Sequence, residues 1–451
     1  MDDGETIGNV ITDGSIWRAI RILALPSVVG FLIEDIFNFT DMYFVGFLGP
    51  EAISAVSIGG IITNFLINGA GGLAVGTLAL VSRFVGEGKP ERADFVATQS
   101  IVFGIVLSIA IGIPCALLAR RMMAGFDVTA AVADYGTQYL TVIFLGCTSV
   151  LLTSFMSAAL RGAGDAITPM VALAVGAIAN VFLDPIMIFG LFGCPRMGVA
   201  GSAVATVLTR IIAIIIMLYA LMGHRTVLKL RRRDMRPDGE TIWRITRVGA
   251  LAALSGIITQ TSVVMMMGFV ATYETAVEAA YGIGIRMNSL VTIPAQGLGY
   301  AGGAIVGQNL GAKKPERAEK AGWIITGLGV AIALPVVLVY YVFPAEMIGM
   351  FTADAHTINA GIPLMRVRAS SLVYLAMSNC LAQTVSGSGD SLHPMLFTTF
   401  SLIVLRLCLI YPLMGAYEEI GIWIDLSLTN FSTGLLNAWW FVIGRWKRTE
   451  V

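Results

Sequence analysis

Long apolar segments separated by short polar loops run through almost the whole chain. Segments long enough to cross the hydrocarbon core of a bilayer as a helix, about 20 residues, lie at 16–47, 53–82, 94–122, 131–160, 166–191 and 198–223. A polar stretch at 224–240 interrupts the pattern, which resumes at 243–271, 276–306, 318–346, 357–385, 391–417 and 421–444. The pattern predicts an all-α polytopic membrane protein with twelve transmembrane helices, six on each side of the polar stretch.

Composition agrees with this pattern. Of the 451 residues, 56% are hydrophobic and only 13% are charged. The mean hydropathy is +0.81, a value typical of a membrane protein with many spans rather than a soluble one. The formal net charge is zero, so only the distribution of charge along the chain carries information about location.

Basic residues gather in alternate loops. The polar stretch HRTVLKLRRRDMRPDGE, the loops RFVGEGKPERA and GAKKPERAEK and the tail GRWKRTEV are basic, whereas the loops GFLGPEA, YETAVE and AYEE contain no Lys or Arg. Basic loops stay on the cytoplasmic side of a membrane. We therefore expect a multi-pass protein of the cell membrane with both termini in the cytoplasm. Arg120, Arg121 and Arg196 are exceptions to this charge pattern, because they lie at the outer ends of spans.

The two halves of the chain repeat each other. GEGKPERA at 86–93 matches GAKKPERA at 311–318, and RGAGDAITPM at 161–170 matches SGSGDSLHPM at 386–395, both at an offset of 225 residues. Six spans per half is an even number, so both halves enter the membrane in the same direction. We expect lobes at 1–223 and 243–451, a basic cytoplasmic linker at 224–242, a pseudo-two-fold along the membrane normal, and a substrate path between the lobes.

The first span carries acids inside its apolar run. Glu34, Asn38 and Asp41 fall at helical spacing on one face, Asp35 points off that face, and Pro26 marks an expected kink. A carboxylate inside a membrane helix is costly and indicates function. The alternative is that these acids only solvate a water-filled vestibule, and that alternative is stronger for Asp35 than for Asp41.

Several motifs together resemble the MATE (multidrug and toxic compound extrusion) family. They are ALP followed by NFTDMYFVGFLG in the first span, NVFLDPIMIFG in the fifth, the paired RGAGD and SGSGD loops, GVAGSAVAT opening the sixth span and VGQNLGA closing the eighth. The resemblance covers nearly the whole chain. It implies an antiporter whose two lobes alternate between inward and outward openings, exporting organic, often cationic, compounds while protons or sodium ions enter.

The distribution of acids resembles the DinF-like branch of that family. At the offset of 225, the acids Glu34, Asp41 and Asp184 of the first half align with the neutral Gln260, Met267 and Leu409 of the second. The resemblance implies a cation-coupling site in the first lobe at Asp41, Asn180 and Asp184, with Ser202 where a small hydroxyl residue is expected. Sodium is the metal that these side chains would hold. The Asp184-Pro185 step could instead be a purely structural kink.

Arginines lie inside the spans of the second half. These are Arg286, Arg366, Arg368 and Arg406. Arg286 could pair with Asp41 across the cavity, and Arg406 could line it; the alternative is that these side chains bond to carbonyls or reach out to the interface. If they face the cavity, an anionic or zwitterionic substrate, including a lipid headgroup, becomes plausible.

Three classes of function compete. A cation-coupled exporter of small organic molecules leads, and a flippase for lipids or lipid-linked precursors is the alternative. An intramembrane protease is opposed because the Gly-Asp pairs, at Asp165 and Asp390, recur by duplication and fit helix N-caps. We expect a monomer that is not an enzyme, contacts membrane lipids through its basic linker, binds no nucleic acid and needs no cofactor beyond its coupling ion, H⁺ or Na⁺.

Overall fold

A computed structural model describes residues 7–126, 128–223 and 226–449, and no strand occurs within these ranges. Short helix α1 (Ile7–Thr12) precedes the first lobe. The first lobe contains α2 (Ile16–Gly46), α3 (Pro50–Gly86), α4 (Pro90–Ala124), α5 (Ala130–Leu145), α6 (Cys147–Gly162), α7 (Ile167–Phe189), the short 3₁₀ turn η1 (Leu191–Gly193) and α8 (Val199–Met222).

The second lobe repeats this order after the turn η2 (Arg232–Met235). It contains α9 (Gly239–Val270), α10 (Thr275–Gly311), α11 (Pro315–Val342), the short α12 (Pro344–Gly349), α13 (Ala355–Ala369), α14 (Ser371–Gly387), α15 (Leu392–Thr399), η3 (Phe400–Leu405), α16 (Arg406–Tyr417), α17 (Glu419–Ile443) and η4 (Arg445–Arg448).

These helices form twelve spans in two six-helix lobes related by a pseudo-two-fold along the membrane normal, as the hydropathy pattern predicts. Within the described ranges, eight spans are individually long and apolar enough to cross a bilayer, and the bent pair α5 and α6 adds a ninth. The other three, formed by α10, by α13 with α14 and by α17, carry more polar residues.

Two predicted spans are broken in the middle. The expected helix at 131–160 is α5 and α6, which meet at Gly146 with a bend of 48°. Its counterpart at 357–385 is α13 and α14, which meet at Ser370, nearly the equivalent position in the repeat. A Cβ atom on Gly146 would lie 2.2 Å from the Val207 side chain, so close helix packing requires the glycine. Hydropathy gives no sign of either break, because each pair of helices lies within one continuous apolar run of the sequence.

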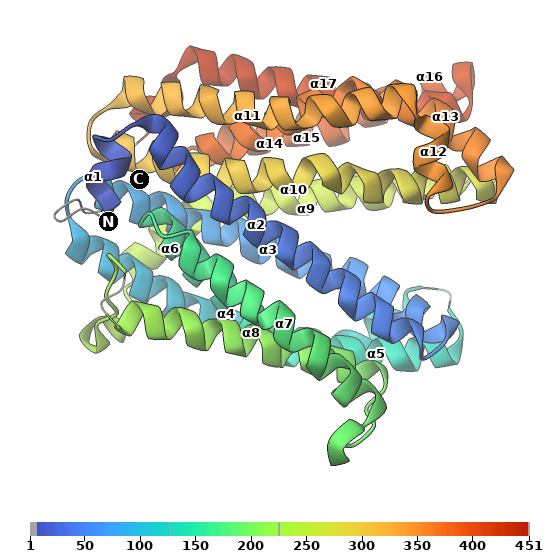
Figure 1. The fold of residues 1–451 in the computed structure, drawn as a ribbon, viewed down its shortest axis with the longest axis horizontal. Coiled ribbons are helices and arrows are strands. Elements are labelled where there is room, and N and C mark those ends of the chain that lie inside the picture. The colour runs from blue at the N-terminus through green and yellow to red at the C-terminus, as the bar shows by residue number, and fades with distance from the viewer. Residues whose placement is uncertain (1–6, 127, 224–225, 450–451) are drawn as a thin grey trace.

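The spans run roughly along the long axis of the molecule, and both termini lie at the same end (Figure 1). The lobes spread apart toward the opposite end (Figure 1). Helix α3 packs along α9, and α10 packs along α2 and α3, so these four helices join the lobes.

The segment before each lobe docks on the other lobe. At the start of α11, Lys314 Nζ lies 2.5 Å from Asp13 Oδ1, and Arg317 donates to the Ile11 carbonyl at 3.1 Å. The Lys314 ammonium holds the pKa of the Asp13 carboxyl below its ordinary value. The second KPERA motif, at 314–318, therefore anchors the N-terminal segment to the second lobe.

The linker is anchored in the reciprocal way. The buried Gln99 of α4 donates to the carbonyls of Asp234 and Arg236, both at 2.7 Å, and accepts from the Asp238 amide at 2.9 Å. Asp94 accepts from the Lys229 amide at 2.8 Å. The linker thus runs over the first lobe before α9 begins, while Arg225 of the predicted basic linker lies outside the described residues.

The crossing of α3 and α9 gives a testable prediction. A Cβ atom on Gly72 would lie 2.2 Å from the Ala253 backbone, whereas a Cβ on Gly69 meets nothing within 4 Å. Gly72→Ala should destabilise the protein by about 1–3 kcal/mol through overpacking, and Gly69→Ala should leave it unchanged or more stable. Thermal unfolding of the purified protein in detergent measures both; equal midpoints for the two variants would show that the crossing does not need the small residue.

Candidate functional site

Two carboxylates and one amide form a buried cluster in the first lobe. Asn180 and Asp184 lie one turn apart on α7, and Asp41 reaches them from α2. The Asn180 Nδ2 donates to Asp41 Oδ1 at 3.4 Å and to Asp184 Oδ1 at 3.2 Å. Asp41 is 8% exposed and the other two side chains are fully buried. The three residues that the sequence groups together are therefore close neighbours.

Helix α8 completes the cluster with hydroxyl groups. Thr206 donates to Asp41 Oδ2 at 2.9 Å. Ser202, one turn earlier on α8, is fully buried, but its hydroxyl bonds to no residue that the structure describes. The same holds for Asn180 Oδ1 and Asp184 Oδ2. Buried polar atoms normally find a partner, so three unpaired oxygen-bearing groups in one cluster indicate a place for an additional donor or cation.

Charge leads to the same conclusion. Within the described part of the chain, no Lys or Arg forms an ion pair with Asp41 or Asp184. Two negative charges buried side by side without compensation are costly, so such a pair holds a proton or a cation. Carboxylate, amide and hydroxyl oxygens are the ligands of hard cations. No group of three His, Cys, Asp or Glu side chains suited to a multivalent metal occurs among the described residues.

A second contact between α2 and α8 lies about two turns of α2 and one turn of α8 from the cluster. Arg210 Nη2 lies 3.3 Å from Glu34 Oε1, with the Arg210 side chain 11% exposed and the Glu34 side chain 29% exposed. Glu34 and Asp41 are seven residues apart on α2, and Thr206 and Arg210 are four apart on α8. The ion pair and the Thr206–Asp41 hydrogen bond therefore tie the same two helices at successive levels.

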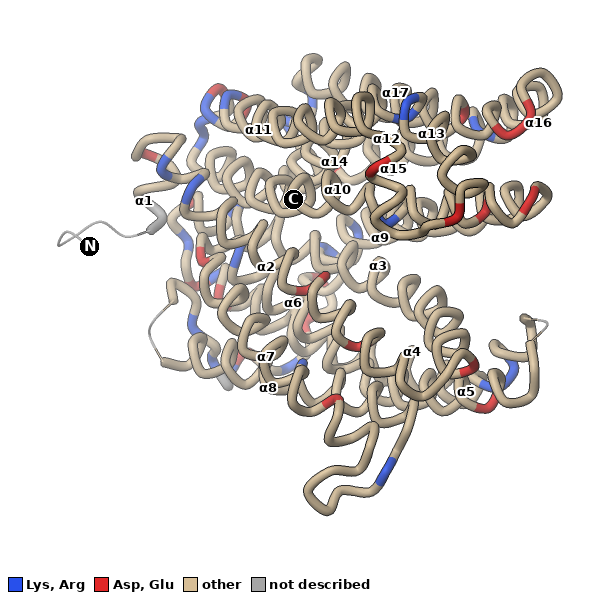
Figure 2. The backbone as a smooth tube through the Cα atoms, turned by 45° about the vertical axis from the view of Figure 1, so that its right-hand side comes forward, with Lys and Arg blue, Asp and Glu red and all other residues tan. Residues whose placement is uncertain are grey.

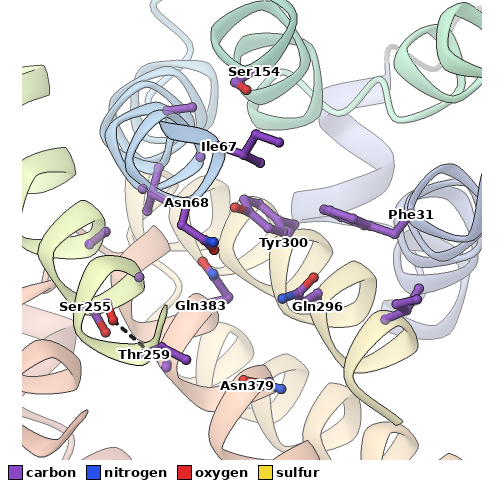
Figure 3. Close-up of a pocket in the computed structure, with 18 of the residues that line it drawn as sticks. Phe31, Ile67, Asn68, Ser154, Ser255, Thr259, Gln296, Tyr300, Asn379 and Gln383 are labelled. Atoms are coloured by element: carbon purple, nitrogen blue, oxygen red, sulfur yellow. Dashed lines mark hydrogen bonds between the residues drawn. The ribbon is translucent and has the colours of Figure 1, made fainter. Parts of the chain in front are cut away.

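A central cavity of about 470 Å³ lies between the lobes (Figure 3). Helices α2, α3, α6 and α8 of the first lobe and α9, α10, α14 and α17 of the second contribute to its wall. Its wall is rich in amides and hydroxyls, including Asn68, Ser154, Thr259, Gln296, Asn379 and Gln383, with the rings of Phe31 and Tyr300 on one side (Figure 3).

Asp35 of the first span differs from the prediction. Glu34 and Asp35 are both half-buried, and Asp35 lines the cavity together with Glu34 and the exposed Asn38, although the periodicity put it off the polar face. The reason is that the cavity-facing residues begin at Phe31, to which Asp35 stands in i+4 relation. Helix α2 is one continuous helix from Ile16 to Gly46 with Pro26 inside it, and the kink expected at Pro26 stays a prediction.

The arginines of the second lobe do not line the central cavity among the described residues. Arg286 is exposed, with its guanidinium carbon 5.5 Å from the Phe39 ring centroid, so it does not pair with Asp41 here. Arg366 is also exposed, and Arg368 is buried beside the Asn288 side chain. The two arginines in the cavity wall are Arg161 and Arg210 of the first lobe, which sequence reasoning did not single out.

Arg406 has a buried partner that the hydropathy pattern conceals. Its Nε lies 3.0 Å from Asp425 Oδ2, its Nη2 donates to Thr429 at 2.7 Å, and its Nη1 bonds to the Ser262 hydroxyl. Asp425 is a single acid in the long apolar run of α17, so the average over the run masks it. Arg406 follows directly on the π-helical turn η3, an irregularity that often accompanies functional positions.

The Gly-Asp loops serve as helix caps. Asp165 accepts from the Thr168 amide at 2.9 Å and Asp390 accepts from the His393 amide at 3.4 Å. Asp390 also accepts from the Trp440 indole at 2.9 Å. Both acids bond within their own lobe, as the N-cap interpretation expects.

Known proteins resemble this chain in both lobes. The MatE family model matches twice, over residues 26–186 and 252–411. The chain is 26% identical over 438 residues to "Probable multidrug resistance protein NorM" of Thermotoga maritima, covering 95% of this chain and 93% of that protein. It is 24% identical over 359 residues to "Multidrug export protein MepA" of Staphylococcus aureus, covering 79% of this chain and 78% of that protein.

A solved structure has the same fold. It is that of a MOP superfamily transporter from Pyrococcus furiosus, for which reverse polarity of the binding pocket is held to suggest a different function. It superposes with a TM-score of 0.91 over 99% of this chain and 100% of that one, at 24% identity.

The buried pair of the second lobe gives a prediction. Arg406→Met leaves the Asp425 carboxylate without its partner, which should cost about 3–5 kcal/mol of stability. The double variant Arg406→Met/Asp425→Leu should regain most of that loss, because no buried charge remains. The exposed Arg366→Met serves as the control and should unfold like the wild type. A double variant no more stable than Arg406→Met in thermal unfolding would contradict the pairing.

Proposed function

The chain belongs to the MatE family of membrane transporters, and we propose that it is a cation-coupled antiporter that exports organic, often cationic, compounds. The similar proteins NorM and MepA are named as a probable multidrug resistance protein and a multidrug export protein, which supports a small-molecule cargo. Within the family we assign the chain to the DinF-like branch, in which the first lobe holds the coupling site. The coupling ion is a proton, a sodium ion or both, and no further cofactor is needed.

The observation that carries this proposal is the cluster of Asp41, Asn180 and Asp184. It contains two buried acids with no cation bonded to them among the described residues, and it lies one turn of α2 from the cavity residue Asn38. A proton or sodium ion arriving there neutralises the pair. The cargo cavity and the ion site thus share α2, which is the element that can couple them.

The proposed mechanism follows from that shared helix. An ion drives a conformational change only by binding the two conformations with different affinity. Entry of the ion in the outward-open state lets α2 pack more closely against α7 and α8 and bend at Pro26. The bend narrows the first-lobe side of the cavity and expels the cargo, and loss of the ion to the cytoplasm restores the helix.

Orientation in the membrane follows the positive charges. Lys and Arg gather at the end of the bundle that carries the N-terminus (Figure 2), and basic segments stay in the cytoplasm. We therefore place both termini and the linker 224–242 in the cytoplasm, between lobes at 1–223 and 243–451. The protein works as a monomer, with the basic linker next to anionic lipid headgroups.

A lipid or lipid-linked precursor flippase is the second candidate. Its support is the cavity wall, where Arg161 and Arg210 accompany Glu34 and Asp35, together with the different function suggested for the Pyrococcus relative. Purified protein in liposomes separates the two candidates: the antiporter moves a soluble dye against an imposed proton or sodium gradient, whereas the flippase moves a labelled lipid between leaflets without moving the dye.

The coupling role of Asp41 can be tested in the same liposomes. Asp41→Asn mimics the protonated carboxyl, so the protein should fold but lose about tenfold or more of its ion-driven flux, along with its dependence on pH and sodium. Asp184→Asn should behave alike, and adding Leu409→Asp should not rescue it. Asp134→Asn, at an exposed position of α5, is the matched control. Wild-type flux with wild-type ion dependence in Asp41→Asn would move the coupling site to Glu34.

The bending role of Pro26 can be tested separately. Pro26→Ala restores a helical hydrogen bond and favours a straight α2 by roughly 3 kcal/mol. Transport should therefore fall more than expression or cargo binding does. Pro114→Ala, which removes the internal proline of α4, is the control and should transport normally. If Pro26→Ala transports at the wild-type rate, bending at this position is not part of the cycle.

A further inference from the structure

Arg161 is a buried cation without a counter-ion. It lies one residue before the end of α6, is 7% exposed and forms part of the wall of the central cavity. Within the described ranges it makes no ion pair and no hydrogen bond, and its Nε is completely covered. Its guanidinium carbon lies 5.0 Å from the ring centroid of Phe31 and 5.5 Å from that of Tyr300.

The two rings form an aromatic surface beside this charge. Phe31 of α2 and Tyr300 of α10 stack with centroids 5.4 Å apart (Figure 3). Contact with aromatic rings stabilises a guanidinium but does not neutralise it. A charge taken out of water without a directly bonded partner remains costly, so an anion bonded to Arg161 would stabilise this position.

The other cavity arginine does not share this property. Arg210 is paired with Glu34 at 3.3 Å, so its charge is already compensated. Asp35 also lines the cavity, and it forms no ion pair among the described residues. Among the described residues of the wall, Arg161 and Asp35 are therefore the charged side chains without a direct ion pair, while Glu34 attracts Arg161 from a greater distance.

Phe31 of α2 links Arg161 of α6 to Asp35 of α2. Asp35 follows Phe31 by four residues, about 6 Å along a helix, and Phe31 contacts Arg161. A compound with an acidic and a basic group on an aromatic body matches this arrangement. The planar guanidinium binds a carboxylate or phosphate through two parallel hydrogen bonds, and the two rings lie beside it for the apolar body.

We propose that Arg161 is the residue that binds an acidic group of the cargo, a carboxylate or a phosphate ester, while Asp35 receives the basic group. This inference rests on the proposed function and deepens it by assigning the two residues that hold the charged ends of a zwitterionic cargo with an aromatic or apolar body. The acid group can belong to a soluble compound or to a lipid, because both present an oxyanion beside an apolar body.

Equilibrium binding to the purified full-length protein in detergent, with no ion gradient, tests this. The probes are one fluorescent aromatic amino acid derivative in three forms: the zwitterion, its methyl ester, which lacks the acid, and its N-acetyl form, which lacks the base. Wild-type protein should bind the zwitterion about tenfold or more tightly than either blocked form, as expected for one charge-assisted hydrogen-bonded pair. Equal affinity for the zwitterion and the ester would overturn the proposal without any mutant.

Variants should then separate the two ends of the compound. Arg161→Gln should lower the affinity for the zwitterion and the N-acetyl form about tenfold and change the affinity for the ester less than twofold. Asp35→Asn should instead lower the affinity for the zwitterion and the ester. Arg161→Lys, which keeps the charge, should retain part of the acid preference and serves if the glutamine variant does not fold. If Arg161→Gln loses affinity for all three probes together, the arginine only shapes the cavity, and the proposal is overturned.

Competition identifies the source of the acid. Short-chain phosphatidylglycerol that displaces the N-acetyl form from wild type, but does not bind Arg161→Gln, supports the site with a lipid phosphate as occupant. Absence of displacement supports it with the carboxylate of a soluble compound. Because no gradient is used, a failure of ion coupling leaves this result intact, and a failure of acid recognition leaves the coupling proposal intact.

Discussion

Two carboxylates buried around one amide nitrogen are the constraint on which the rest of this structure depends. Asp41 and Asp184 both accept from Asn180, and neither has a bonded cation in the described chain. Burial of two such charges is tolerated only with a proton or a cation between them. In the coupling that we propose, the occupancy of this small cluster sets how closely α2 can pack against α7 and α8.

Helix α2 connects this cluster to the central cavity. Its Asp41 belongs to the cluster, whereas Glu34, Asp35 and Asn38 line the cavity. The Glu34–Arg210 ion pair and the Asp41–Thr206 hydrogen bond fasten it to α8 at two levels. The route that we propose between ion and cargo is a shift of α2 that alters both levels together.

The two lobes share an architecture but treat charge differently. The first, fifth and sixth spans of each lobe meet at a buried polar cluster, and in the second lobe Arg406 neutralises Asp425 within the chain. In the first-lobe cluster no Lys or Arg of the described chain is bonded to the acids. The duplicated fold thus holds one acid cluster with its own buried ion pair and one without, and the latter is where we propose that an external ion binds.

Much of the architecture follows from the sequence. Twelve spans come from hydropathy, the lobes from repeated loop motifs, and the grouping of Asp41 with Asp184 from the resemblance to the family. The breaks at Gly146 and Ser370 do not, and at Gly146 close packing against Val207 requires the glycine. Asp425 is hidden in an apolar run, and the importance of Arg161, Thr206 and Arg210 depends on which neighbours the fold brings to them.

The most direct test of the central claim is the number of ions exchanged when cargo binds to the purified protein. Binding is reciprocal, so a cargo that disfavours the ion-bound form must release that ion. In weakly buffered solution with a pH indicator and a sodium electrode, cargo addition should release about one monovalent cation per chain. The fraction of the released ions that are protons should fall as the sodium concentration is raised. Saturable cargo binding with no release of either ion would contradict the account.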